Sequence, residues 1–130
     1  MSEEQIALAR RAVACVPIER WPDWTPVKTD IGMHGVLLTF CGNRYVLWGD
    51  GNETPVKDDA FPVLGAPAGI GSLLAVVREA HGRPDAVCCR GITGCGDVGW
   101  AVLCDRILVA LTNQYATEAE ALVSALEAAP

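Results

Sequence analysis

The chain lacks the features that would place it in a membrane or on nucleic acid. Although 51% of its 130 residues are hydrophobic, no uninterrupted apolar run approaches the roughly 20 residues of a membrane-spanning helix. Lysine and arginine number 10 against 16 aspartates and glutamates, for a net charge of −6. Binding to nucleic acid regardless of sequence depends on basic side chains that neutralise phosphates. We therefore expect neither a membrane nor a nucleic-acid partner.

The N-terminus also lacks the basic start and continuous apolar stretch of a secretory signal. It reads Met-Ser-Glu-Glu, and an amphipathic pattern follows. We therefore expect a cytoplasmic protein, folded as a single domain over residues 1–130. In a reducing compartment the six cysteines are expected to be free thiols packed as small hydrophobic side chains, although their even number would also allow disulfides.

The clearest predicted helix covers residues 67–82. Pro67 suits a first helical position, apolar residues then recur at helical spacing, and Gly82 ends the pattern. Gly69 and Gly71 weaken the first turn by about 1 kcal/mol each relative to alanine. We expect them to allow close approach of a strand backbone.

Capping boxes, in which serine or threonine precedes glutamine or glutamate by three positions, mark two more helices. Ser2 and Gln5 predict a helix that starts at Glu3. The other box opens a C-terminal helix with three apolar residues directed inward. These residues are Thr117 and Glu120, then Leu122, Val123 and Leu126.

Apolar runs separated by turn residues predict about five strands. The clearest pair flanks Gly42-Asn43, a two-residue hairpin signal. The predicted strands are residues 36–41, 44–48, 86–90, 99–104 and 107–111. The proline-rich residues 18–30 and the polar residues 49–65 are expected to be irregular.

Several of these strands are apolar on both faces, which is typical of a sheet covered on both sides. Short connections between strands favour antiparallel pairing. The sequence therefore predicts the α+β class: an α/β/α sandwich, with a mainly antiparallel sheet of about five strands and three helices.

Gly94-Cys-Gly-Asp-Val-Gly99 matches the G-x-G-x-x-G pattern of dinucleotide-binding folds. In those folds the motif opens a helix, whereas here it precedes a predicted strand, and no G-K-[ST] phosphate loop is present. We expect residues 91–99 to connect two neighbouring antiparallel strands. Cys95 in this loop is the weak candidate for a nucleophile, with only His34 and His81 available as a base.

Weak candidates for zinc ligands are Cys88, Cys89, Cys95 and His81. They lack the C-x-x-C spacing that lets two thiolates reach one ion, and adjacent strand residues point to opposite faces. We therefore expect neither a metal nor another cofactor. The loop residues Asp50, Asn52 and Glu53 do not follow the ligand order of a calcium loop, and they are expected to form a solvated turn.

Three helix-patterned segments and a tryptophan pair carry a resemblance. They are Ile6-Ala-Leu-Ala-Arg-Arg-Ala-Val13, Gly71-Ser-Leu-Leu-Ala-Val-Val-Arg-Glu-Ala80, Thr117-Glu-Ala-Glu-Ala-Leu-Val-Ser-Ala-Leu-Glu-Ala-Ala129, and Trp21 with Trp24. In this order the chain resembles small uncharacterised proteins of tailed phages and prophages, including the group called the phage ABA sandwich domain. The resemblance implies a fold and a genomic setting, hence the cytoplasm of a host cell, and it brings no catalytic residues.

The leading hypothesis is a non-enzymatic phage accessory protein that binds another protein, such as a host or defence component. Trp21 and Trp24 are the candidate anchors, because tryptophan is enriched in binding hot spots, unless both indoles cover a sheet edge. Asp50, Asn52 and Glu53 are the candidate acidic rim. Two alternatives stay open. One is a small enzyme or ligand-binding domain that uses residues 91–99 and Cys95, and the other is a virion or assembly component that self-associates, for example as a homodimer.

Overall fold

The computed structural model describes residues 3–29, 31–56, 59–92, 98–104, 107–108 and 117–129, and its class is α+β, as predicted. Its helices are α1 (Glu3–Cys15), the short 3-10 helix η1 (Ile18–Arg20), α2 (Pro67–His81) and α3 (Glu118–Glu127). No helix in this described part of the chain is long and apolar enough to cross a membrane. The chain divides into two compact units, Met1–Ser72 and Leu73–Pro130.

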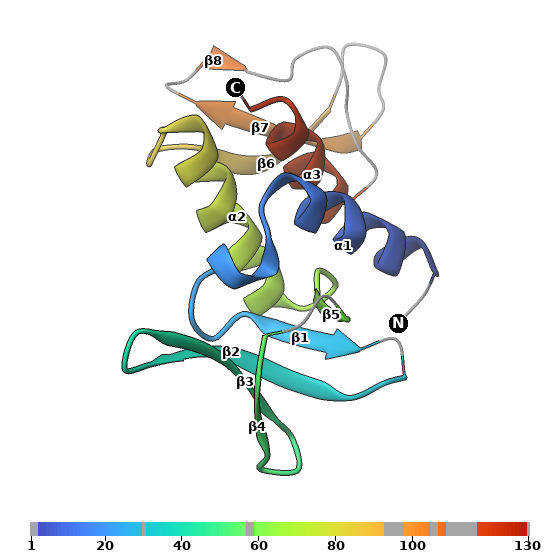
Figure 1. Cartoon of the computed structure of the whole chain (residues 1–130). Helices are drawn as coiled ribbons and strands as arrows, with labels where there is room; N and C mark the ends of the chain where they lie inside the picture. The colour runs from blue at the N-terminus through green and yellow to red at the C-terminus, as the bar shows by residue number, and fades with distance from the viewer. Residues whose placement is uncertain are drawn as a thin grey trace. The chain divides into compact units, whose positions relative to one another are not determined.

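The first unit holds a five-stranded antiparallel sheet in the order β4-β3-β2-β1-β5 (Figure 1). Its strands are β1 (Pro26–Thr29), β2 (His34–Phe40), β3 (Asn43–Trp48), β4 (Glu53–Pro55) and β5 (Ala60–Pro62). The pairing of β2 with β3 confirms the predicted hairpin. Its turn lies one residue earlier than predicted, because Cys41 and Gly42 have the positive φ angles, 52° and 79°, that a type I′ turn needs at both central positions.

Two segments that the sequence predicts to be irregular contribute strands. Residues 18–30 contain β1, and residues 49–65 contain both β4 and β5, so these two predictions are wrong. Val27 pairs with Gly35 on one side and with β5 on the other, and no local pattern signals such long-range pairing. Proline is compatible with these strands because it lies at a strand end in each: Pro26, Pro55 and Pro62.

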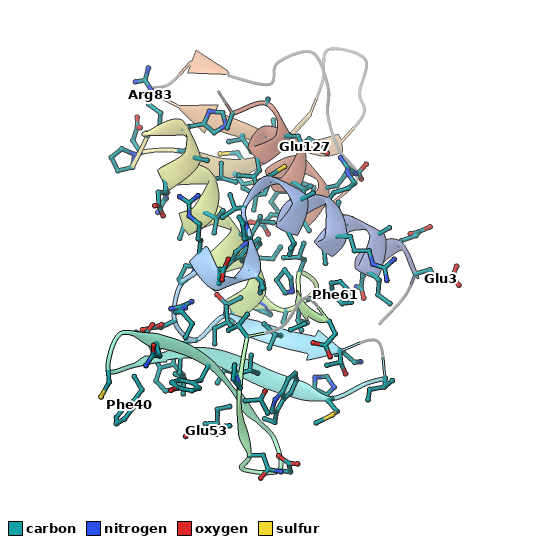
Figure 2. The ribbon with its side chains drawn as sticks, viewed as in Figure 1. Glu3, Phe40, Glu53, Phe61, Arg83 and Glu127 are labelled. Atoms are coloured by element: carbon teal, nitrogen blue, oxygen red, sulfur yellow. The ribbon has the colours of Figure 1, made fainter. Side chains whose placement is uncertain are left out.

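The two faces of this sheet differ in burial. The inner face carries Val27, Leu37 and Val46, which are almost completely buried. Figure 1 shows α1 and η1 on one side of the sheet, and Figure 2 shows Phe40 and Glu53 on the side away from α1. The apolar residues on both faces of β2 predict a cover on each side. On β2 itself, Leu37 of the inner face is buried, whereas Phe40 of the outer face is 71% exposed.

The second unit holds a three-stranded antiparallel sheet in the order β6-β7-β8. Its strands are β6 (Val87–Ile92), β7 (Val98–Cys104) and β8 (Ile107–Leu108). β6 and β7 are neighbours, as predicted for the two flanks of the glycine-rich segment. The predicted strands thus belong to two sheets instead of one. Residues 93–97, with Cys95, and residues 109–111 lie outside the described residues.

α3 begins and packs as its sequence predicts. The Thr117 hydroxyl accepts a hydrogen bond from the Glu120 N–H at 3.1 Å, which satisfies one of the free N–H groups of the first turn. The three predicted core residues of this helix are all buried: Leu122, Val123 and Leu126.

Two glycines in the first turns of α2 have different roles. A Cβ atom at Gly69 would overlap the carbonyl oxygen of Val63, which lies directly after β5. A backbone therefore approaches Gly69 closely, as predicted, although it belongs to the residue that follows β5 and not to the strand itself. A Cβ atom at Gly71 would meet nothing within 4 Å, so the same prediction is wrong for Gly71.

Alanine at these two glycines is therefore expected to act in opposite directions. Gly69→Ala should lower the free energy of unfolding by about 3 kcal/mol, because the backbone at Val63 must move. Gly71→Ala, the matched control, should raise it by up to about 1 kcal/mol, because alanine favours the helix and fits without contact. Denaturant unfolding of both variants measures the difference. Equal effects of the two substitutions would contradict this packing.

Candidate functional site

The segment between η1 and β1 places its two tryptophans in opposite environments. Trp21 is 1% exposed, and its indole Nε1–H donates to the Val16 carbonyl at 2.9 Å. Trp24 is 68% exposed, and its backbone N–H donates to the Leu37 carbonyl of β2 at 2.7 Å. One predicted anchor is therefore part of the core, and the other is presented to solvent.

Trp24 also has an unusual backbone conformation. Its φ of 69° lies in the left-handed region, which a bulky L-residue rarely adopts and which costs on the order of 1–3 kcal/mol. The neighbouring residue fixes it, because the Thr25 carbonyl accepts from the Leu37 N–H at 3.0 Å and the Thr25 hydroxyl donates to the Pro22 carbonyl at 2.7 Å. Backbone strain that the surrounding residues maintain, here at a residue with an exposed side chain, is often found at functional sites.

A single arginine of β3 ties this segment to the hairpin. Arg44 Nη1 donates to Asp23 Oδ1 at 2.5 Å and to the Thr39 hydroxyl at 2.6 Å, while Nη2 donates to the carbonyl of Trp21. The Thr39 hydroxyl in turn donates to Asp23 Oδ1 at 2.8 Å. We call Arg44, Asp23 and Thr39 with the Trp21 carbonyl the Arg44 clamp. Charge-assisted hydrogen bonds of this kind are about twice as strong as neutral ones.

The Arg44 clamp was not predicted from the sequence. Asp23 and Arg44 are 21 residues apart, so no local spacing relates them. Arg44 is 23% exposed, and its Nε is buried without a hydrogen-bond partner among the described residues, which costs on the order of 1–3 kcal/mol. The other hydrogen bonds of the guanidinium must offset this cost. Their geometry holds the chain between η1 and β1 against the hairpin.

The outer face of the five-stranded sheet is the second candidate surface. Phe40, near its hairpin end, is 71% exposed, and the other apolar residues are half-buried. Lys28 of β1 and Glu53 of β4 lie on opposite sides of these apolar residues, and β5, with the buried Phe61 opposite Lys28, continues the sheet beyond β1. A cluster of partly exposed apolar side chains with charged side chains at its border is typical of an interaction surface. We define the outer face by its apolar residues Val36, Leu38, Phe40, Tyr45 and Leu47.

The acidic candidates form the turn between β3 and β4. Asp50 accepts from the Asn52 backbone N–H at 3.0 Å and from the Asn52 side-chain amide at 2.9 Å. The carboxylate thus closes its own turn, and with exposed Glu53 beside it the segment is a solvated turn, as expected. This turn follows the end of β3, whereas the Arg44 clamp is near its beginning. The acidic residues and Trp24 are therefore not brought into one site.

A small pocket lies beside Trp48 in the first unit. Its volume is about 170 Å³, below the 300–1,000 Å³ typical of pockets for drug-sized ligands. The indole Nε1–H of Trp48 donates to the Thr54 hydroxyl at 2.7 Å and is not available to a ligand. The lining residues are Thr29, Ile31, Met33, Trp48, Thr54, Pro55 and Asp59.

The thiol of Cys88 is poorly suited to chemistry. Burial raises its pKa from 9.0 to about 12, and the negative charges of Glu118 and Cys89 act in the same direction. Because the thiolate is the nucleophile, a thiol that stays protonated is a poor nucleophile at neutral pH. Neither Cys88 nor Cys89 forms a disulfide within the described part of the chain.

The other weak candidates give no metal site within the described ranges. His81 Nε2 lies 2.6 Å from the Ala125 carbonyl of α3, and this hydrogen bond occupies that nitrogen. No three histidine, cysteine, aspartate or glutamate side chains in this part of the chain are grouped to hold an ion. Cys95, the candidate nucleophile, lies outside the described residues.

Comparison with known proteins adds no further assignment. No protein-family model, curated protein or solved structure matches the chain. The interpretation of Trp24 and the outer face therefore depends on their geometry.

The raised pKa predicts slow alkylation of Cys88. At pH 8 a thiol of pKa about 12 is thiolate in roughly one molecule in 10⁴, so iodoacetamide should modify Cys88 at least about 10-fold more slowly than exposed Cys41 in the folded protein. Between pH 8 and 9 the rate at Cys88 should rise about 10-fold, because the thiolate fraction rises by that factor below the pKa.

Peptide mass mapping of a labelling time course measures both rates. In denaturant the two cysteines should react at similar rates, which serves as the control. Equal rates at Cys88 and Cys41 in the folded protein would show that the environment described for Cys88 is incorrect.

Proposed function

We propose that the protein acts without catalysis, as a binding protein that uses Trp24 as the anchor for another protein. One observation carries the proposal: a tryptophan that is 68% exposed is held by its neighbours in a left-handed conformation. Tryptophan is among the residues most enriched in binding hot spots. A large apolar side chain that is exposed at this conformational cost fits a binding role better than a structural one.

The Arg44 clamp supports this proposal through preorganisation. Binding normally costs about 0.5–1.5 kcal/mol for each flexible side chain or loop residue that becomes ordered. Asp23, directly before Trp24, is already fixed by Arg44 and Thr39, and the Trp24 N–H is already bonded to β2. The segment is therefore ordered before a partner arrives, and less of the contact energy is lost on binding.

The resemblance to tailed-phage and prophage proteins supports a phage setting within this proposal. A phage accessory protein acts in the host cytoplasm, and a host or defence protein is the partner that this setting favours. The partner must offer an apolar pocket that accepts an indole, because aromatic anchors contribute most when they are fully desolvated in a pocket.

Replacement of Trp24 by asparagine tests the anchor. Asparagine tolerates a positive φ, so Trp24→Asn should change the free energy of unfolding by no more than about 0.5 kcal/mol. Partners recovered with tagged protein from phage-host cells should be lost, or their Kd raised at least about 30-fold, as for a hot spot worth 2 kcal/mol or more.

The matched control is Val87→Ser, which removes an exposed apolar side chain from β6 of the second unit. This variant should recover the same partners as the unaltered protein. Recovery of the same partners with unchanged affinity by Trp24→Asn would refute the anchor.

A second candidate function is a virion or assembly component that acts through self-association. A separate observation favours it, namely the partly exposed apolar outer face of the first unit.

A further inference from the structure

We propose that the outer face is the interface of a symmetric homodimer, in which the sheets of two copies pack face to face. This inference rests on the second candidate function, self-association, and names its partner as a second copy of this chain. It is independent of the role proposed for Trp24.

The centre of the outer face has the composition of an interface core. Val36 is directly opposite Leu47, and Leu38 is directly opposite Tyr45, so two apolar pairs lie in adjacent rows on the same face. All four side chains are half-buried by their neighbours in the sheet, and Phe40 at the end of β2 is 71% exposed. Pairs of stacked sheets lie about 10 Å apart when such side chains interdigitate.

The edges of the sheet are less suitable for association. β4 and β5, the two edge strands, have three residues each, and each ends in a proline that cannot donate a hydrogen bond. Short strands and prolines at a sheet edge oppose addition of another strand. The face, rather than the edge, is the surface of this sheet that a second copy can cover.

The charges on the outer face select a second copy as the occupant. Glu53 lies on β4 and Lys28 on β1, at opposite sides of the apolar centre. A two-fold axis parallel to the strands, between β2 and β3, places β4 of one copy over β1 of the other. Glu53 of each copy then faces the region of Lys28 of the other, so the same opposite-charge pair forms twice.

The positions along the strands allow this pair to form. Glu53 is in the row of Leu47, Val36 and Pro26, and Lys28 is two residues beyond Pro26 on β1. Two residues of a strand span about 7 Å, which the two long side chains can bridge across the interface. Neither Glu53 nor Lys28 has an ion-pair partner among the residues that the structure describes.

The size of the face predicts a weak dimer. The four strands β1 to β4 hold 20 residues, and at a rise of about 3.4 Å per residue and a strand spacing of about 4.8 Å they give a flat area of roughly 330 Å² per copy. Two copies bury roughly 650 Å² before side-chain relief is included, which is below the roughly 1,000 Å² of a stable specific interface and is typical of a weak or transient one. A Kd in the micromolar range is therefore expected.

Analytical ultracentrifugation of the full chain, loaded from about 1 to about 100 µM, tests the proposal. The unaltered protein should show a monomer–dimer equilibrium. Leu38→Lys should raise the dimer Kd at least about 10-fold, because it places a charge in the apolar centre of both faces. Lys28→Glu alone should also weaken the dimer, and Lys28→Glu with Glu53→Lys should restore it to within about 3-fold, because the pairs are re-formed with reversed sign.

Val87→Ser is again the control and should leave the Kd unchanged, while denaturant unfolding confirms that each variant folds. A monomer at all concentrations, or a dimer that is insensitive to Leu38→Lys, would overturn the proposal. Failure of the double charge reversal to restore association would overturn the proposed two-fold arrangement.

If the chain is monomeric while Trp24→Asn loses its partners, the homodimer fails and the anchor function stands. If the chain dimerises through the outer face while Trp24→Asn keeps its partners, the reverse holds.

Discussion

The guanidinium of Arg44 is the constraint on which the surface of the first unit depends. Through one side chain it holds the Asp23 carboxylate, the Thr39 hydroxyl and the Trp21 carbonyl. These bonds tie the chain between η1 and β1 to β2 and β3, in a segment where the indole of Trp21 is buried and that of Trp24 is exposed. The Nε of Arg44 is buried and has no hydrogen-bond partner in the described part of the chain. This unsatisfied donor lowers stability, which is consistent with a geometry kept for function.

The same hairpin provides two surfaces with different physical characters. The inner face of β2 and β3 is closed, with Leu37 and Val46 buried, and it contributes to stability. The outer face presents an apolar centre between charges of opposite sign, and Trp24 has an exposed side chain on a backbone that is hydrogen-bonded to β2. The proposed binding function and the proposed self-association would account for both features, whereas Cys88 and the Asp50 turn are explained by burial and by turn geometry.

The sequence predicted the features that depend on local pattern. The capping box at Thr117, the helix start at Pro67 and the hairpin are confirmed because their signals lie within a few residues. β1, β4 and β5 were missed because their ladders depend on long-range pairing. The alternation in residues 36–40 already indicates which side chains share a face of β2, but the sequence alone does not show that only one face is covered. Likewise, nothing in Trp21-Pro-Asp-Trp24 shows which indole is buried, because this segment is held by long-range contacts such as the bond between Asp23 and Arg44, 21 residues apart.

The central claim, that the Arg44 clamp holds Trp24 in a fixed and exposed position, is tested most directly by fluorine NMR of protein labelled with 5-fluorotryptophan. The Trp24 resonance, assigned with Trp24→Phe, should show a large shift between H₂O and D₂O, as an exposed indole does. In Arg44→Gln this resonance should move or broaden because the segment loses its anchor, while the resonance of Trp48, bonded to Thr54, should stay unchanged. A Trp24 signal that is shielded from solvent, or that does not respond to Arg44→Gln, would contradict the account.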